Sequence, residues 1–316
     1  MKKTFFLLFL AILFVGSSSQ KPSNTRLEGT LPEGSITFML ASDMGRHGVS
    51  EQKNIAEIMG QLADDIKVDF LAVAGDPIHD KGVTCVEDDE WKLKIEDVYT
   101  AQSLHDIPWY VISGNHEYNG SVQAILDYSN ISDRWNAPER YFSFSQKIGN
   151  SDENCLFVFI DTTPLIDSYR NDKKYSDAGE QCMERQLFWL DSTLVASNSR
   201  WKIVIGHHPI YCGTTKEIDQ RIDMQERVGN ILENRNVDFY IGGHIHNFQY
   251  VKPEGKSVNY IVNSSASRSR EVVPADGVVF SNSDPGFSLF NVSQESVQFY
   301  FINHTGETVY FYQNEK

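Results

Sequence analysis

Cysteine is scarce in this sequence of 316 residues, which contains only four, and no two of them have the spacing of a CxxC pair. A zinc knuckle is therefore not expected, because such sites take their ligands from closely spaced cysteine pairs. In an oxidising compartment the four allow one or two disulfides among three pairings, and four free buried thiols are the alternative. None has the context of a catalytic thiol. The cysteines are Cys85, Cys155, Cys182 and Cys212.

Long hydrophobic runs are missing after the first 19 residues. The N-terminal segment carries two lysines, the apolar run FFLLFLAILFV and the small-residue patch GSSS. This layout predicts a secretory signal peptide at residues 1–19, and the run is too short for a membrane-spanning helix. An uncleaved N-terminal anchor is the alternative. Both interpretations place the remaining chain outside the cytosol, secreted or periplasmic, and after cleavage no membrane association is expected.

Basic residues are also few, with 28 lysines and arginines against 43 acidic residues and a formal net charge of −15. This balance argues against nucleic acid or an anionic membrane as a partner. A small anionic substrate would need local positive charge, which bound metal cations can provide. Most of the acidic residues are expected to lie on a solvated surface.

Internal repeats, low-complexity tracts and long proline- or glycine-rich linkers are absent as well. We therefore expect one domain at residues 35–316, preceded by an N-terminal extension at residues 20–34. A chain of this length can build one large core. We expect the protein to be a monomer.

Nearly continuous apolar runs, rich in β-branched and aromatic residues, predict strands that are buried on both faces. Helical patterns separate several of them, and this alternation indicates an α/β fold. The predicted strands lie in residues 35–43, 68–76, 108–115, 155–161, 200–208 and 237–244. The predicted helices lie in residues 54–67, 89–104, 183–197 and 224–234.

After residue 245 the pattern changes to short strands alone, at residues 248–253, 258–265, 277–283, 287–292, 296–303 and 308–313. Such a tail is expected to form a second sheet that packs on the first. The predicted architecture is therefore two packed mixed β-sheets flanked by helices.

Polar residues that can bind metals stand where the buried strands end. In open α/β sheets the carboxyl ends of strands form the ligand-binding crevice, so these residues are expected to converge. A single Asp or His in such a place is usually a turn former, but six of the nine histidines lie at or just beyond these ends. Carboxylates and imidazoles together suit first-row metals, and two metals about 4 Å apart can clamp a phosphate and generate hydroxide from water. The strand-end residues are Asp43, Asp76, Asn115, His116, Asp161, His207, His208, His244 and His246, and the sixth histidine, His79, lies just beyond Asp76.

Five ordered blocks in the sequence resemble those of the calcineurin-like metallophosphoesterases. The blocks are DMG (43–45), GDPIH (75–79), GNHE (114–117), VIGH (204–207) and GHIH (243–246). Within that superfamily the chain is most similar to the small purple acid phosphatases of the tartrate-resistant type, on the segments QLFWLDSTL, GGHIHNFQY and NYIVNSSAS. The resemblance covers about residues 35–303 and implies a four-layer α/β/β/α sandwich.

The resemblance also implies a centre of two metal ions, with Asp76 bridging them. His116 would contact the substrate phosphate together with Asn115 and protonate the leaving alcohol, while a metal-bound hydroxide attacks phosphorus in line. One metal would be held by Asp43, Asp76, His79 and His246, and the other by Asp76, Asn115, His207 and His244.

The sequence departs from this family at His79, where purple acid phosphatases have a tyrosine that binds ferric iron and produces the colour. A neutral imidazole removes one negative charge from the site, so we expect a colourless enzyme that accepts Fe, Zn or Mn. The alternative is that His79 merely faces solvent in a turn.

A second departure lies downstream of His207, where the family offers another substrate histidine and this chain has Lys216 and Glu217. Lys216 is expected to be a surface lysine, with phosphate binding as the alternative. Arg46 is expected to form a salt bridge, although it lies near enough in sequence to reach phosphate, as does His47. No role is assigned to His208.

Three functional hypotheses follow. The leading one is a secreted phosphatase that hydrolyses phosphate monoesters. A phosphodiesterase or nucleotidase is the second, because the same two-metal core serves both reactions. The third is a non-catalytic binding protein that keeps the fold, and it is disfavoured because every ligand position holds a competent donor and His116 is present.

Overall fold

The computed structural model describes residues 31–215 and 218–316. The predicted signal peptide, most of the N-terminal extension, and Lys216 with Glu217 lie outside the described residues. No helix in the described part of the chain combines the length and apolarity that crossing a membrane requires.

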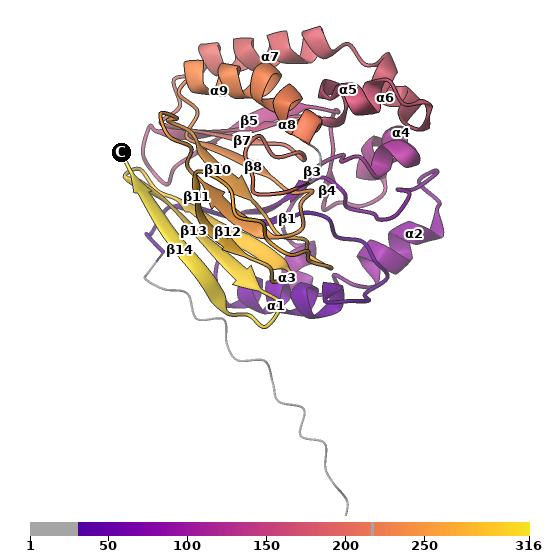
Figure 1. The fold of residues 1–316 in the computed structure, drawn as a ribbon. Helices are drawn as coiled ribbons and strands as arrows, with labels where there is room; N and C mark the ends of the chain where they lie inside the picture. The colour runs from indigo at the N-terminus through magenta and orange to yellow at the C-terminus, as the bar shows by residue number, and fades with distance from the viewer. Residues whose placement is uncertain (1–30, 216–217) are drawn as a thin grey trace, which may run out of the picture.

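Two seven-stranded mixed β-sheets form the centre of the molecule, as predicted (Figure 1). In the first sheet the strands β1 to β4 run parallel and the strands β12 to β14 run antiparallel. In the second sheet β6, β7, β8 and β10 are parallel. The first sheet has the order β14 (Thr308–Glu315), β13 (Ser296–Asn303), β12 (Gly286–Val292), β1 (Ile36–Ala41), β2 (Phe70–Ala74), β3 (Trp109–Ile112) and β4 (Trp135–Asn136). The second has the order β11 (Val278–Asn282), β9 (Phe248–Val251), β10 (Asn259–Val262), β8 (Phe239–Gly242), β7 (Trp201–Ile205), β6 (Asn154–Phe159) and β5 (Phe142–Lys147).

The C-terminal strands do not form a sheet of their own, and the prediction that they would do so was wrong. Strands β9 to β11 extend the second sheet, whereas β12 to β14 extend the first. Strand β12 pairs antiparallel with β1, from Ile36 opposite Val292 to Leu40 opposite Ser288. The physical reason is that both parallel halves leave an open edge, and buried backbone groups on such an edge need hydrogen-bond partners.

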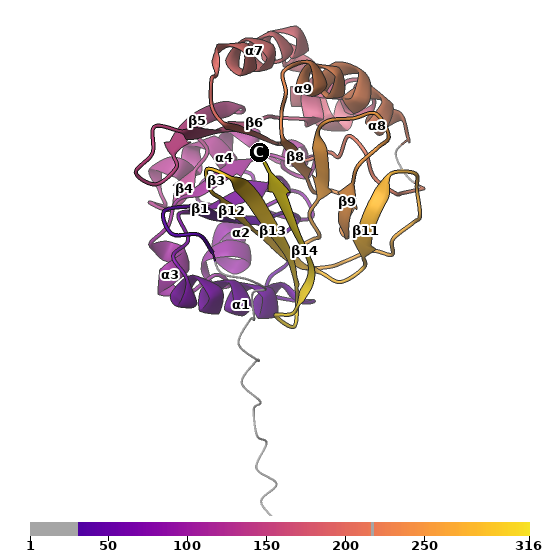
Figure 2. The ribbon, with the colours of Figure 1, turned by 90° about the vertical axis from the view of Figure 1, so that its left-hand side faces the viewer.

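Helices cover the outer faces of both sheets (Figures 1 and 2). The predicted helices at residues 54–67 and 183–197 are present as α1 and α7, whereas those at 89–104 and 224–234 are interrupted by π-helical turns. The helices are α1 (Gln52–Asp65), α2 (Asp89–Trp91), α3 (Gln102–His105), α4 (Val122–Asp127), α5 (Asp167–Arg170), α6 (Ser176–Glu180), α7 (Met183–Ala196), α8 (Ile218–Met224) and α9 (Asn230–Asn234).

Three hydrophobic cores separate the four layers. The core between the sheets is rich in phenylalanine, and the Phe38 ring stacks at 4.9 Å between centroids on both Phe70 and Phe290. A second core lies beneath α1 on the first sheet, and a third lies beneath α7 and α9 on the second. This packing buries both faces of each sheet, which explains why the strand sequences are nearly continuous apolar runs.

No disulfide joins the four cysteines in the structure, so neither disulfide alternative is formed. The alternative of four buried thiols holds only in part, because Cys85 and Cys182 are exposed and Cys155 and Cys212 are buried.

Candidate metal centre

The loops that follow β1, β2, β3, β7 and β8 place the predicted ligands at one edge of the sheet sandwich. Four groups of three residues have potential ligand atoms that all lie within 4.8 Å of one another. Every predicted ligand of the Asp and His type belongs to at least one group, and Asp76 belongs to two. The groups are Asp43, His79 and His246; Asp43, Asp76 and His207; Asp76, His79 and His116; and His207, His208 and His244.

Asp76 occupies the middle of this arrangement. Its Oδ2 lies 3.2 Å from Nε2 of His207, 3.7 Å from Nε2 of His79 and 3.8 Å from Nε2 of His116. Its other oxygen accepts a hydrogen bond from the backbone amide of His116 at 2.9 Å. One carboxylate oxygen thus faces three imidazoles, as a bridging ligand would.

Hydrogen bonds to the protein fix the orientation of two of the imidazoles. Nδ1 of His207 lies 2.9 Å from the carbonyl oxygen of Ala74, and Nδ1 of His246 lies 2.7 Å from that of Arg268. A carbonyl oxygen only accepts, so Nδ1 carries the proton in each neutral ring and Nε2 presents a lone pair. Metal-binding histidines are usually held through their second nitrogen in this way.

Lone pairs therefore face each other in two buried contacts. Nε2 of His246 lies 3.1 Å from Oδ1 of Asp43, and Nε2 of His207 lies 3.2 Å from Oδ2 of Asp76. Two acceptors at this distance need a cation between or beside them, which can be a proton or a metal ion. Burial lowers the pKa of the His207 imidazole, but the charge of Asp76 outweighs burial and raises this pKa to about 10. Without a metal, a proton on Nε2 of His207 therefore fills the contact with Asp76.

Unpartnered polar atoms support the fit of this site to metal ions. Within the described residues, Oδ1 of Asp43, Oδ1 of Asn115 and both ring nitrogens of His79 are buried without a hydrogen-bond partner. Buried polar atoms are rarely left in that state, because their desolvation is not compensated. Carboxylate, amide and imidazole donors together suit divalent first-row metals.

The charges in the cluster are strongly coupled. Burial raises the pKa of both Asp43 and Asp76, but the neighbouring imidazoles, His246 and His207 respectively, outweigh burial and hold each pKa below its ordinary value. Burial lowers the pKa of His79 to about 3, against the opposing charges of Asp76 and Asp43. His79 is only 1% exposed, so the alternative in which it faces solvent in a turn was wrong.

Backbone strain is concentrated in the same loops, and it was not predicted from the sequence. The described chain contains seven non-glycine residues with positive φ, and four of them are predicted ligands. Such conformations cost about 1–3 kcal/mol each and persist where the surrounding structure enforces them. The four are Asp43 (53°), Asp76 (49°), His244 (68°) and His246 (63°).

Two glycines that stand directly before Asp76 and Asn115 make room for the cluster. Gly75 has a φ of 81°, and a Cβ on it would lie 2.5 Å from Nδ1 of His207. A Cβ on Gly114 would lie 2.2 Å from Oδ1 of Asp76. Any side chain at either position would therefore displace a predicted ligand.

Glu117 is a residue of the site to which the sequence analysis assigned no role, although it stands in the GNHE block. Its side chain is completely buried and accepts hydrogen bonds from the backbone amides of Gly114 at 2.8 Å and Ile78 at 3.2 Å. It thus ties the loop after β2 to the loop after β3. Burial, reinforced by the charge of Asp76, raises the pKa of this carboxyl to about 8.

His116 is the accessible histidine of the cluster. Its side chain is 26% exposed, and its Nδ1 lies 2.5 Å from the backbone oxygen of Asp80. Nε2 is consequently the nitrogen that faces both Asp76 and the open side of the site.

Asp161, Arg46 and His47 do not join the cluster. Asp161 accepts a hydrogen bond from the Tyr118 hydroxyl, so the expectation that all six strand ends converge was wrong at β6. Arg46 pairs with Asp80 at 3.1 Å, which is the expected salt bridge. His47 instead pairs with Glu90 at 3.0 Å.

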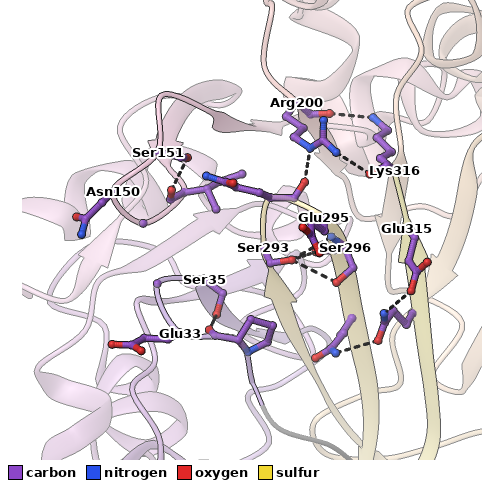
Figure 3. A pocket seen from close by; sticks show the side chains of 17 residues that line it. Glu33, Ser35, Asn150, Ser151, Arg200, Ser293, Glu295, Ser296, Glu315 and Lys316 are labelled. Carbon is purple, nitrogen blue, oxygen red and sulfur yellow. Dashed lines mark hydrogen bonds between the residues drawn. The ribbon is translucent and has the colours of Figure 1, made fainter.

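A large hollow lies at the opposite end of the strands (Figure 3). It has a volume of about 1310 Å³ and is bordered by Ser35, just before β1, and Arg200, just before β7. No predicted ligand borders it.

The fold and the cluster together define a class of metal-dependent hydrolases that act on phosphate esters. The family model described as calcineurin-like phosphoesterase matches residues 36–248, and the chain belongs to this family. Its dinuclear metal centre is implied by the family, and the groups described above supply candidate ligands.

Individual relatives agree with this assignment. The chain is 29% identical to purple acid phosphatase 4 of Arabidopsis thaliana, over 90% of this chain and 85% of that protein. It is 27% identical to tartrate-resistant acid phosphatase type 5 of Mus musculus, over 89% and 91% of the two chains. Among solved structures, that of GAP50, an anchor in the inner membrane complex of Plasmodium, shares the fold with a TM-score of 0.77 and 23% identity, over 89% of each chain.

Proposed function

We propose that this chain is a secreted phosphatase that hydrolyses phosphate monoesters at a centre of two metal ions. The observation that carries the proposal is the pair of buried contacts in which an imidazole lone pair faces a carboxylate oxygen, His246 with Asp43 and His207 with Asp76. When bound, two cations supply the Lewis acidity that neutralises phosphoryl charge and activates water for in-line displacement. The proposed ligands are Asp43, Asp76, His79 and His246 for one ion and Asp76, Asn115, His207 and His244 for the other.

His116 is proposed to bind the substrate phosphate, together with Asn115, and to protonate the leaving alcohol. Its backbone amide is held by Asp76, so the ring is fixed beside the bridging carboxylate. Because Nδ1 is bonded to the oxygen of Asp80, the proton available for transfer is the one on Nε2 of the doubly protonated ring. General acid catalysis of this kind typically contributes about 10²- to 10⁴-fold in rate.

The identity of the metals is proposed from the donor set. His79 contributes a neutral imidazole, which is buried and whose ring nitrogens have no hydrogen-bond partner in the described chain. With no phenolate at this position, we propose Fe, Zn or Mn and a colourless protein. Metal analysis and a visible spectrum of the purified chain test this, and an intense purple band would contradict it.

Substrate class is tested with a nitrophenyl phosphate monoester and the corresponding bis ester across pH. Faster turnover of the monoester is expected. Preference for the diester would instead support the phosphodiesterase or nucleotidase hypothesis. If the metal-loaded protein hydrolyses neither ester, that result supports the non-catalytic hypothesis. The fold is shared with an anchor protein, so the architecture alone does not settle the function.

Secretion is proposed from residues 1–19. Sequencing the N-terminus of the protein recovered outside the cytosol tests it, and a start near residue 20 is expected. An intact N-terminus in the membrane fraction would favour the uncleaved anchor.

A further inference from the structure

His208 is a buried histidine of the cluster that has no role in the proposed mechanism. It follows His207 directly beyond β7 and is 1% exposed. Its ring centroid lies 4.9 Å from that of His207 and 4.4 Å from that of His244. These three histidines form the one candidate group within the described residues that is made of imidazoles alone.

The orientation of His208 matches that of a held ligand. Its Nδ1 lies 2.8 Å from Oγ1 of Thr162, and the same hydroxyl accepts a hydrogen bond from the His208 amide at 3.1 Å. Its Nε2 is buried and has no hydrogen-bond partner in the described chain. In His207 and His246, Nδ1 likewise lies at a protein oxygen, a carbonyl that only accepts. The Thr162 hydroxyl can donate or accept, and Nε2 of His208 presents a lone pair in the tautomer whose Nδ1 donates to Oγ1.

We propose that His208 is an additional imidazole ligand of the second metal site, beside His207 and His244. This inference rests on the metal centre of the proposed function and adds a fifth protein ligand to that site. The strand β6 then contributes to the centre through Thr162, which orients His208, and not through the neighbouring Asp161.

Simple packing is the competing explanation, because the His208 ring also lies against His244 and, at 5.1 Å, against Tyr169. An apolar ring would fill that space without leaving a buried nitrogen unpaired. The unpaired Nε2 therefore favours a ligand role.

A site with three imidazoles is expected to hold zinc more tightly than manganese, since nitrogen donors suit the later first-row metals. The other site has two aspartates and two imidazoles, so it is expected to discriminate less between these ions. The two sites should consequently fill at different zinc concentrations.

The test is a zinc titration of the metal-free protein against a competing chelator. The wild type is compared with His208→Phe. The control is His105→Phe, because His105 lies at an exposed position on α3. Phenylalanine keeps the packed ring and removes both nitrogens. We expect two zinc ions in the wild type and the control. In His208→Phe we expect one unchanged site and one weakened about 10- to 100-fold, together with a smaller rise in Tm on adding zinc.

If each of the two sites binds zinc as tightly in His208→Phe as in the wild type, the proposal is overturned and the metal centre is left intact. Fewer than two zinc ions in the wild type would overturn the metal centre itself. If His208→Phe does not fold, His208→Gln and His208→Ala are titrated in the same way, and unchanged zinc binding in either one overturns the ligand role.

Discussion

The two ends of the strand sandwich differ in how their polar groups are satisfied. At the carboxyl end, the aspartates and histidines of the cluster are buried, several of their atoms lack partners in the described chain, and four residues have strained backbones. At the opposite end, around the hollow of Figure 3, the polar groups bond to one another. Arg200 donates to the carbonyl oxygen of Lys316 at 2.6 Å, and the Lys316 ammonium donates to that of Arg200 at 2.8 Å.

In this chain the proposed metal centre is distinguished by unsatisfied polar groups and backbone strain, not by volume. The hollow is large, and polar groups that border it bond to one another, as Arg200 and Lys316 do. The cluster is compact and incomplete without cations. Substitutions at the two ends should therefore have unequal effects on metal binding and activity.

Asp76→Asn is expected to have the largest effect. The neutral amide removes the carboxylate charge that faces three imidazoles, so metal affinity should collapse and phosphatase activity should fall by about 10²- to 10³-fold or more. Metal content and turnover of a nitrophenyl phosphate measure this. The matched control at the opposite end is Glu33→Gln, an exposed carboxylate that borders the hollow. If Asp76→Asn keeps full activity, the reaction does not occur at this cluster.

Gly75→Ala is expected to have the second largest effect. The added Cβ would meet the His207 ring at 2.5 Å in a backbone with a φ of 81°. Gly255→Ala is the control, because Gly255 has a φ of 75° with nothing within 4 Å of an added Cβ. The control should lose about 1–2 kcal/mol of stability from backbone strain alone, and Gly75→Ala should lose more and also bind metal weakly. Equal losses in the two variants would mean that the site tolerates the displacement of His207. Chemical denaturation and metal analysis give both readouts.

Glu117→Gln is expected to have a smaller effect. An amide side chain offers one acceptor atom, so it cannot accept from both Gly114 and Ile78, and one buried amide would lose its partner at a cost of about 1–3 kcal/mol. Because the two loops carry predicted ligands, metal affinity should fall about 10- to 100-fold, as is typical for groups that hold ligands in place. Unchanged affinity would show that the loops keep their positions without Glu117.

Much of the site was predictable from the sequence, because parallel strands end at one edge of their sheet. That rule placed Asp43 with Asp76 in the first sheet and His207 with His244 in the second, and the packing of the two sheets brings the two pairs together. It could not foresee that Asp161, also at a strand end, would accept the Tyr118 hydroxyl instead, since that partner belongs to another loop. Glu117 was missed because its role is to accept from backbone amides, which leave no trace in the residue pattern.

The fold was predictable in class but not in strand order. Apolar runs identified the strands, and every predicted strand of the tail exists. Their division between two sheets depends on which edges remain open after the parallel halves form, and that is a property of the assembled sheets. The predicted helix at residues 89–104 is divided into α2, a π-helical turn and α3, and Ser103 of α3 donates to the carbonyl oxygen of Gly60 in α1 at 3.0 Å.

Asp161→Asn is expected to have the smallest effect, confined to the pH dependence of stability. Burial raises the pKa of Asp161 to about 7, from an ordinary value of 3.8. Between these values the folded state binds the proton more tightly than the unfolded state does, so this carboxyl contributes stability that is complete below pH about 4 and is lost as the pH rises to about 7. Asparagine does not titrate, so the variant should show a flatter stability profile between pH 4 and 7 and be relatively more stable than the wild type above pH 7.

Denaturant unfolding at several pH values measures this, and parallel profiles for the variant and the wild type would contradict it. Metal content should stay unchanged in this variant, since Asp161 lies outside the four candidate groups.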